Sequence, residues 1–539
     1  MLELFLGLMV FLELVAPFVT KTYGIDARFH LLWIDQFSRL ISEGVFIPTW
    51  VSSGFHGFGS STFYFYPPVT YYVASGIHLL SGITQPTLLY QITSLLATIA
   101  SFFTARVFLR SLNASRYQAM LGAALYAFAP VRMFELYNRG ALASHLAYVF
   151  LPLVWMGLLQ IVQNKVPIRG RRILLLAVSS ALLALTSVGI TLATAICIAI
   201  AASLQWKQCT RRVWIESAMA ICLAASLVAY HYASALSALS FSRVSNLYYH
   251  HAAGDIWLWF HPGAGTYNLL LIYAMVGIIA VSYIVARRRK EYLVRVEQLT
   301  IQVGLSISVF VLFLDFSPLS AWLWNSPLFH LIQIPWRFYP QLLLFATVVV
   351  GIAYSGSLRL GAKAIIWLSA LGLILPIAVV LSSWHSLDRP PAEDDAYAPR
   401  SSIPSDNLEA MILSHQQDPF ALTDLHDGEE IRGIPGIPYS GKFNVAFQTV
   451  HSITFHRFYW PYWHLYVNGN EIPSRPDSIG RATAVLPAGR YSADWQLERT
   501  PLETAGLWIS GIAWSGVVIF WGIGLARRHV RKKHPIVTA

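Results

Sequence analysis

Charged residues and cysteines are scarce in this chain of 539 residues. Asp, Glu, Lys and Arg together make up 12% of it, about half the share found in soluble domains. The three cysteines lie in or beside apolar runs, so their spacing builds neither a disulfide framework nor a zinc cluster. Hydrophobic residues make up 55% of the chain and the mean hydropathy is +0.53. This composition excludes disordered, collagen-like and disulfide-scaffold proteins and predicts a protein embedded in lipid.

The basic residues give the chain a net charge of +11 and gather in short loops between apolar runs. Such clustering is typical of cytoplasmic loops of membrane proteins, whereas a nucleic-acid-binding protein carries one continuous basic face. The charge is therefore a topology signal, and no nucleic-acid partner is expected. The basic loops contain Arg110 and Arg116, Lys165 to Arg172, Lys207 to Arg212, Arg287 to Arg295, Arg359 and Lys363, and Arg527 to Lys533.

Twelve apolar runs are long enough to cross a bilayer. They predict an all-α polytopic membrane protein of about 12 transmembrane helices with both termini inside, in which the first run is an anchor and not a cleaved signal peptide. The run at 67–83 is read as a short helix in the outer interface, because a crossing there would place Arg110 and Arg116 outside. The predicted spans are 2–20, 87–109, 117–133, 142–163, 172–187, 189–206, 213–232, 267–286, 298–315, 338–356, 362–383 and 505–526.

With twelve crossings and both termini inside, the chain divides into three parts. They are a polytopic region, 1–383, an outer domain, 384–503, and a last helix with a basic tail, 504–539. The outer domain holds sixteen of the 27 acids, and its part at 440–500 reads as short strands separated by turns. A small extracytoplasmic β-domain that binds or orients the acceptor glycan is expected there. Its Trp460, Trp463 and Tyr466 either contact that glycan or, preferably, form the domain core. The polytopic region contributes the outer segments 21–86, 133–141, 233–266 and 316–337.

The first outer segment is rich in candidate functional residues. Asp26 and His30 share one face if this part is helical. A carboxylate at the outer membrane boundary suggests a functional role, because charge at that depth is costly. The alternative is an interfacial helix that Asp26 caps at its N-terminus. Asp35 and Glu43 are expected to be either solvated or paired with Arg39. The glycine- and aromatic-rich stretch at 54–68 offers rings that could stack on sugars.

The other outer segments supply further candidates. Glu135 and Arg139 form an ion pair if helical, or Arg139 acts with His145 on an anionic lipid head group. Arg337, beside Trp336, either clamps a phosphate or anchors the chain at the interface.

The third outer segment contains His250, His251 and Asp255. These side chains are read either as metal ligands or, preferably, as hydrogen-bonding partners of a hydroxyl-rich substrate. A divalent metal is left open, and no cofactor is otherwise expected.

Several short blocks occur in an order that resembles a family. Gly24-x-Asp26-x-x-x-His30, Pro48-x-Trp50 and Tyr66-Pro67-Pro68 resemble the first outer loop of GT-C-class bacterial glycosyltransferases. The blocks at 138–143 and 334–338 resemble the multispanning family related to 6-pyruvoyl-tetrahydropterin synthase. The blocks at 459–469 and 486–489 resemble the outer β-domain of lipoteichoic-acid glycosylation proteins.

This resemblance implies a GT-C-like fold with Asp26 as the catalytic carboxylate and with Arg337 and Arg139 as ligands of a lipid phosphate. One departure is evident, because family members often carry Glu where this chain has Ser144. The missing acid raises the question of whether the chain binds a metal or is active. The residues assigned to substrate binding are His30, Tyr66, Glu135, Arg139, His145, His250, His251, Asp255, Gln333, Trp336 and Arg337.

The sequence thus predicts an inverting glycosyltransferase that moves a sugar from a polyprenyl-phosphate carrier to an envelope glycan or glycolipid outside the cytoplasmic membrane. Its expected partners are the lipid-linked sugar, the acceptor and membrane lipids. The alternatives are a flippase or transporter for lipid-linked sugars and a non-catalytic assembly partner in envelope glycan synthesis.

Overall fold

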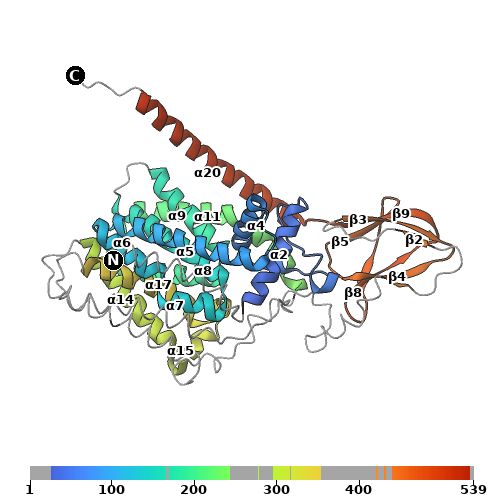
Figure 1. The fold of residues 1–539 in the computed structure, drawn as a ribbon, viewed down its shortest axis with the longest axis horizontal. Coiled ribbons are helices and arrows are strands. Elements are labelled where there is room, and N and C mark those ends of the chain that lie inside the picture. Colours follow the sequence, from blue (N-terminus) through green and yellow to red (C-terminus); the bar gives the residue numbers. More distant parts are fainter. Residues whose placement is uncertain are drawn as a thin grey trace.

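The computed structural model combines a helical region with a small β region near the C-terminus (Figure 1). It describes residues 26–164, 169–242, 277, 295–315, 317–353, 420–422, 430–432 and 440–533. The predicted spans at 2–20 and 362–383, almost all of 267–286, and the candidates His250, His251 and Asp255 lie outside these residues.

The helical region is mostly made of helices joined by short turns. Pairs that are adjacent in sequence also pack together, such as α5 with α6 and α8 with α9. The main helices are α2 (Ala27–Ser42), α4 (Val69–Ser81), α5 (Pro86–Ser111), α6 (Arg116–Ala127), α7 (Pro130–Phe134), α8 (Leu142–Gln163), α9 (Arg169–Ala184), α10 (Val188–Leu204), α11 (Arg211–Ala238), α14 (Arg295–Asp315), α15 (Ser317–Trp324), α17 (Tyr339–Ala353) and α20 (Pro501–Lys533).

Five helical stretches among the described residues are long and apolar enough to cross a membrane. They agree with a polytopic membrane protein, while the total of twelve crossings stays a prediction. Helix α4 covers most of the ambiguous run at 67–83 and is about 20 Å long, too short to cross the bilayer. Its interfacial position is likewise still a prediction. The five stretches are Pro86–Ser111, Arg116–Tyr137, Leu142–Gln163, Arg211–Phe241 and Pro501–Ile523.

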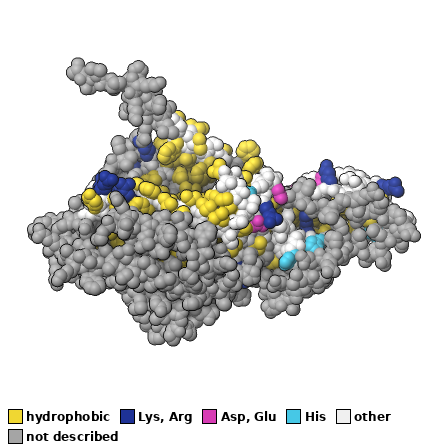
Figure 2. Space-filling model, in the orientation of Figure 1, with side chains coloured by type: hydrophobic (Ala, Val, Ile, Leu, Met, Phe, Trp, Pro, Cys, Tyr) yellow, Lys and Arg dark blue, Asp and Glu magenta, His cyan; other side chains and the backbone are white. Residues whose placement is uncertain are grey.

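The helices alternate in direction and thereby separate two ends of the helical region. One end holds the last residues of α5, α8 and α10 and the first residues of α6, α9 and α11. The basic residues there are Arg110, Arg116, Arg169, Arg172, Arg211 and Arg212. There Arg212 donates a hydrogen bond to the Ile161 carbonyl, so α11 begins where α8 ends. The opposite end holds the starts of α2, α8 and α10. Figure 2 shows an apolar helical surface with dark blue Lys and Arg side chains at its far end from the β region.

The β region consists of two antiparallel sheets. One has the strand order β2-β3-β9-β5-β6 and the other β1-β4-β8-β7. Rings from facing strands pack between them, as with Phe455 of β4 and Trp495 of β9, whose centroids lie 4.7 Å apart. The strands are β1 (Phe420–Leu422), β2 (Glu430–Arg432), β3 (Ser440–Phe447), β4 (His451–Phe458), β5 (Trp463–Val467), β6 (Asn470–Ile472), β7 (Ser474–Pro476), β8 (Arg481–Leu486) and β9 (Gly489–Leu497).

Two of the three aromatic residues expected in the β core are there. Trp460 and Trp463 are buried. The expectation for Tyr466 was wrong, because side chains alternate along β5: Trp463, Leu465 and Val467 point inward, while Tyr466 lies on the opposite, partly exposed face.

The stretch at 50–64 completes the β core. Trp50, Phe55, Phe58 and Tyr64 belong to the same buried cluster as the strands, and the rings of Trp50 and Trp460 lie 5.2 Å apart. Phe55, Phe58 and Tyr64 lie in the stretch 54–68 that was expected to offer rings to sugars, and for these three rings the expectation was wrong. The stretch at 50–64 attaches the β region to the segment that carries Asp26.

Candidate functional site

Asp26 lies at the first turn of α2, yet its carboxylate does not cap that helix. Asp26 Oδ2 instead accepts a hydrogen bond from Arg139 Nη2 at 2.9 Å. The two backbones also meet, since the Asp26 N–H donates to the Arg139 carbonyl at 2.8 Å. Asp26 therefore occupies the N-cap position of α2, but its side chain makes a long-range ion pair in place of a capping hydrogen bond.

The turn that carries Arg139 is a π-helical turn, Glu135–Arg139, between α7 and α8. It ends at Gly140, whose φ is +75°, and a Cβ there would come within 2.5 Å of the Ala27 Cβ. Glycine is therefore required on two grounds, its left-handed conformation and this close approach. The turn presses against the start of α2 and holds Arg139 beside Asp26.

The expected pair of Glu135 and Arg139 is present and is extended by Asp26. Glu135 Oε1 lies 3.6 Å from Arg139 Nη1, so one guanidinium lies between two carboxylates. Glu135 is almost fully buried, whereas the Asp26 side chain is 36% exposed. Asp26 is thus the carboxylate of this pair that a ligand can reach.

His145 does not pair with Arg139. It is fully buried in α8, and its ring contacts the Arg132 guanidinium and the Thr98 hydroxyl, the latter at 2.9 Å. Arg132 also lies over the Tyr148 ring, 4.9 Å from its centroid. Sequence reasoning missed this buried arginine, since nothing in the pattern at 130–134 distinguishes it from an interface anchor.

Arg337 enters the site from a 3-10 turn, Pro335–Phe338. Its Nη1 donates to the hydroxyls of Ser144 at 3.0 Å and Ser187 at 3.4 Å. Ser187 is the N-cap of α10, and a Cβ on Gly189 would lie 3.0 Å from Arg337. The guanidinium therefore packs against a helix N-terminus, which carries partial positive charge of its own.

Trp336 connects the two arginines, because the Arg139 guanidinium lies 5.2 Å from the centre of its ring. The charges are close enough to affect each other. Burial lowers the pKa of Arg337 and neighbouring Arg139 lowers it further, while Tyr66, Glu135 and Asp26 raise it. Two arginines and two carboxylates therefore form one electrostatic cluster, with the turn around Trp336 at its centre.

Three donors in this cluster have no hydrogen-bond acceptor within the described ranges. They are Arg139 Nη1, Trp336 Nε1 and Arg337 Nε, all of which are buried. A buried donor without an acceptor is costly. A ligand oxygen that reached any of these donors would remove that cost.

His30 and Tyr66 form an aromatic wall next to Asp26. His30 Nδ1 is hydrogen-bonded to the Tyr71 hydroxyl at 2.8 Å, and the rings of Tyr66 and Trp33 lie 4.5 Å apart. Burial lowers the pKa of His30 to about 4, against a smaller upward effect of Asp26, so its ring is neutral at pH 7. Burial also raises the pKa of Tyr66, which keeps its phenol protonated.

The remaining candidates have less to do with this cluster. Gln333 lies four residues before Arg337 in a turn with φ +71°, and among the described contacts its side chain does not reach the ion pairs. Asp35 pairs with Arg39 at 2.9 Å as expected. Over the ranges that the structure describes, no group of three His, Cys, Asp or Glu side chains is arranged to hold a metal.

Comparison with known proteins gives only remote structural similarity. No known protein family and no curated protein sequence matches the chain. A cryo-EM structure of the arabinofuranosyltransferase AftD from mycobacteria superimposes with a TM-score of 0.42 and 17% identity, over 71% of this chain and 27% of that one. A mutant of the same enzyme gives 0.42 and 15%, over 76% and 30%. The chain therefore spans less than a third of the length of these enzymes.

Proposed function

We propose that this protein is a membrane glycosyltransferase that moves a sugar from a polyprenyl-phosphate carrier to an envelope glycan or glycolipid on the outer side of the cytoplasmic membrane. The observation that supports this most is the convergence of Asp26, Arg139 and Arg337 in one partly exposed cluster. The cluster lies at the end of the helices opposite the basic turns. By the positive-inside rule that end faces outward.

In the proposed reaction Asp26 acts as general base. Its carboxylate takes the proton of an acceptor hydroxyl, whose oxygen attacks the anomeric carbon of the donor. The bond between that carbon and the phosphate oxygen breaks, and the electron pair leaves with the phosphate. Attack on the side opposite the leaving group inverts the anomeric configuration.

Arg337 stabilises the departing phosphate. Its guanidinium lies against the N-terminus of α10, and both favour an anion at the same place. The acceptor-less donors Arg337 Nε, Trp336 Nε1 and Arg139 Nη1 offer hydrogen bonds to phosphate oxygens. Because the leaving group is a stable anion, a base and these donors suffice without an acid partner.

Arg139 has a positioning role as well. It fixes the Asp26 carboxylate through Oδ2 and receives support from Glu135 on its other side. His30 and Tyr66, uncharged at pH 7, provide hydrogen-bonding groups and ring faces suited to a sugar. Membrane lipids surround the donor tail.

Members of the family that this chain resembles often carry Glu where it has Ser144, and this difference is consistent with activity. A Glu at 144 would place a carboxylate against Arg337, whereas the Ser144 hydroxyl accepts a hydrogen bond from Arg337 without neutralising it. The guanidinium therefore keeps its charge for a phosphate.

A transporter is less well supported, because transporters place their polar sites near the bilayer midplane and this cluster lies at helix ends. A non-catalytic assembly partner would not need an exposed carboxylate facing an anion site. Both alternatives predict that the purified protein transfers no sugar.

The test is transfer of radiolabelled hexose from a polyprenyl-phosphate hexose by purified protein in lipid nanodiscs. Asp26→Asn should lower the rate about a thousandfold, because the amide cannot accept the proton. Asp35→Asn is the matched control on the same helix and should keep the wild-type rate. Equal rates for the two variants would remove Asp26 from the chemistry.

A further inference from the structure

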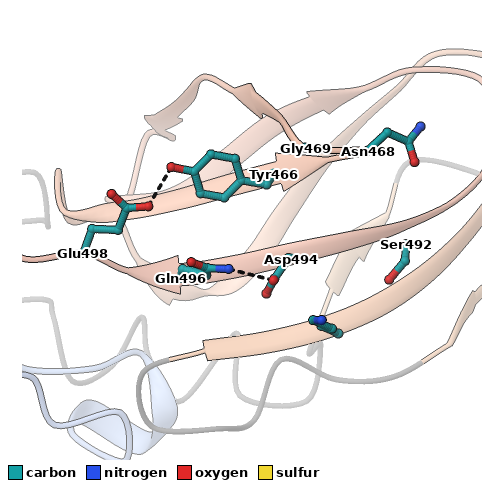
Figure 3. A pocket seen from close by; sticks show the side chains of 8 residues that line it. Tyr466, Asn468, Gly469, Ser492, Asp494, Gln496 and Glu498 are labelled. Carbon is teal, nitrogen blue, oxygen red and sulfur yellow. Dashed lines mark hydrogen bonds between the residues drawn. The ribbon is translucent and has the colours of Figure 1, made fainter.

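The outward face of the five-stranded sheet contains a polar hollow of about 500 Å³ (Figure 3). Its floor comes from three neighbouring strands, β3, β9 and β5, and the Asn468-Gly469 turn closes one end. It is lined by Lys442, Tyr466, Asn468, Gly469, Ser492, Asp494, Gln496 and Glu498.

Strand alternation creates this face. Residues 493 and 495 of β9 point into the core, so Ser492, Asp494, Gln496 and Glu498 form a row on the other side. Register then places Lys442 and Tyr466 on either side of Asp494. Side chains directly opposite each other on neighbouring strands interact, so a cation, a carboxylate and an aromatic ring stand side by side.

Hydrogen bonds hold this row in place. The Tyr466 hydroxyl donates to Glu498 Oε1 at 2.6 Å, and Gln496 Nε2 donates to Asp494 Oδ2 at 2.7 Å. The bond to Glu498 raises the pKa of Tyr466 to about 12, so the phenol stays uncharged at neutral pH. The polar groups are therefore already oriented before a ligand arrives.

The opposite sheet provides a comparison within the same region. The outward side chains of its strands β4 and β8 are Ser452, Thr454, His456, Thr483 and Val485. None of them is a carboxylate, and the one ring, His456, packs on Phe58 at 4.2 Å between centroids and is hydrogen-bonded to the His56 carbonyl. A merely solvated sheet face needs no more than this, whereas the hollow combines a ring with charged, amide and hydroxyl groups.

We infer that this hollow binds a neutral oligosaccharide through the row Lys442–Asp494–Tyr466 and its neighbours on β9. Sugar hydroxyls both donate and accept hydrogen bonds, and the lining supplies acceptors in Asp494 and Glu498, donors in Lys442, and both in the amides. Tyr466 offers an aromatic surface to the apolar C–H face of a sugar ring. With one positive and two negative side chains, the hollow disfavours anionic ligands.

The position of the hollow matches an acceptor chain. Glu498 lies three residues before α20 begins, and the row from Glu498 to Ser492 extends about 20 Å away from that helix. An oligosaccharide on β9 would thus run outward from the membrane-proximal end of the β region. Its assignment as acceptor rests on the proposed function, whereas its binding does not.

The experiment measures oligosaccharide binding to the full chain in nanodiscs by saturation-transfer NMR and calorimetry, without donor lipid and in the Asp26→Asn background. The probes are linear hexaoses of glucose, mannose and galactose, with heparin as the anionic probe. At least one hexaose should bind, and Tyr466→Ala should weaken it about tenfold. Asp494→Asn should weaken it less, and Val485→Ala on the other sheet is the matched control.

Three outcomes would overturn the inference: no hexaose binds, Tyr466→Ala binds as well as Val485→Ala, or heparin binds and the hexaoses do not. Tyr466→Phe separates ring from hydroxyl and should keep most of the affinity. Because binding is measured in a variant that lacks the proposed base, failure of sugar transfer and failure of this inference are separate results.

Discussion

Each end of the helical region holds a cluster of arginines and carboxylates, and the two clusters differ in exposure. At the basic end, Glu216 contacts Arg172 at 3.0 Å, and 1% and 4% of these two side chains are exposed; Arg169, at 3.3 Å from Glu216, covers the pair from outside with 54% of its side chain exposed. At the other end, 36% of the Asp26 side chain and 22% of Arg139 are exposed. The same residue types thus form a closed ion pair that joins α9 to α11 at one end and an open site at the other.

Among these changes, removing the Arg337 guanidinium at the open end should have the largest effect on the rate of sugar transfer. Arg337→Ala should slow sugar transfer about a thousandfold, because the leaving phosphate loses a charged donor. Arg337→Lys should recover part of the rate, since an ammonium keeps the charge but not the forked geometry. Arg39→Ala, at an exposed ion pair on α2, is the control in the radiolabel assay and should leave the rate unchanged.

Breaking the closed cluster should instead affect folding. Glu216→Gln leaves Arg172 buried without its carboxylate and should lower the free energy of unfolding by about 3 kcal/mol. The melting temperature of the protein in detergent would report it. Sugar transfer per folded molecule should stay at the wild-type level, and a large fall there would contradict the division between the two ends.

Acid should destabilise the open end through His30. Its pKa is about 4 in the folded protein and about 6.5 when unfolded, so the unfolded chain binds the proton first. Stability is therefore full above about pH 6.5 and is lost as pH falls toward 4, by about 3 kcal/mol. Thermal melts from pH 8 to 4 should show a smaller acid loss for His30→Gln, and equal slopes would place the ring outside the buried wall.

A carboxylate added to the open end should have the smallest effect. Ser144→Glu would face Arg337 in place of the present hydroxyl and compete with the phosphate, so the KM for the lipid donor should rise about tenfold. Ser144→Gln is the uncharged control of the same size. A lower KM in Ser144→Glu than in Ser144→Gln would argue against a phosphate at Arg337.

Long apolar runs and short strand-like segments allowed much of the fold to be predicted. Helices α5, α8 and α11 lie where hydropathy predicts them, and the strands from β3 to β9 fall within the predicted 440–500 stretch. The rings of Phe55, Phe58 and Tyr64 were misjudged, because aromatic residues in such a stretch are equally compatible with a sugar platform and with a core. Only the docking of Trp50 on Trp460 distinguishes these.

The site was predicted in its parts but not in its connections. Asp26 and Arg337 were chosen as charged groups at membrane boundaries, where a charge needs a reason. Arg139 was chosen as a candidate ligand of a lipid head group and through the family resemblance. That Asp26 pairs with Arg139 could not be inferred, since the two are far apart in sequence and any of several basic residues could have been the partner. His145 contacts Arg132 and not Arg139. This could not be predicted, because no local sequence pattern marks Arg132 as a buried residue.

The sequence by itself determined that this chain is an apolar, multi-helix protein with a polar β region. Apolar runs, strand patterns and clusters of basic residues can each be recognised within a short segment, because each segment must suit the lipid or water around it. The tertiary structure alone decided which charges meet. Ion pairs such as Asp26 with Arg139, and rows such as Lys442, Asp494 and Tyr466, depend on how turns and strand registers bring distant segments within a few ångströms.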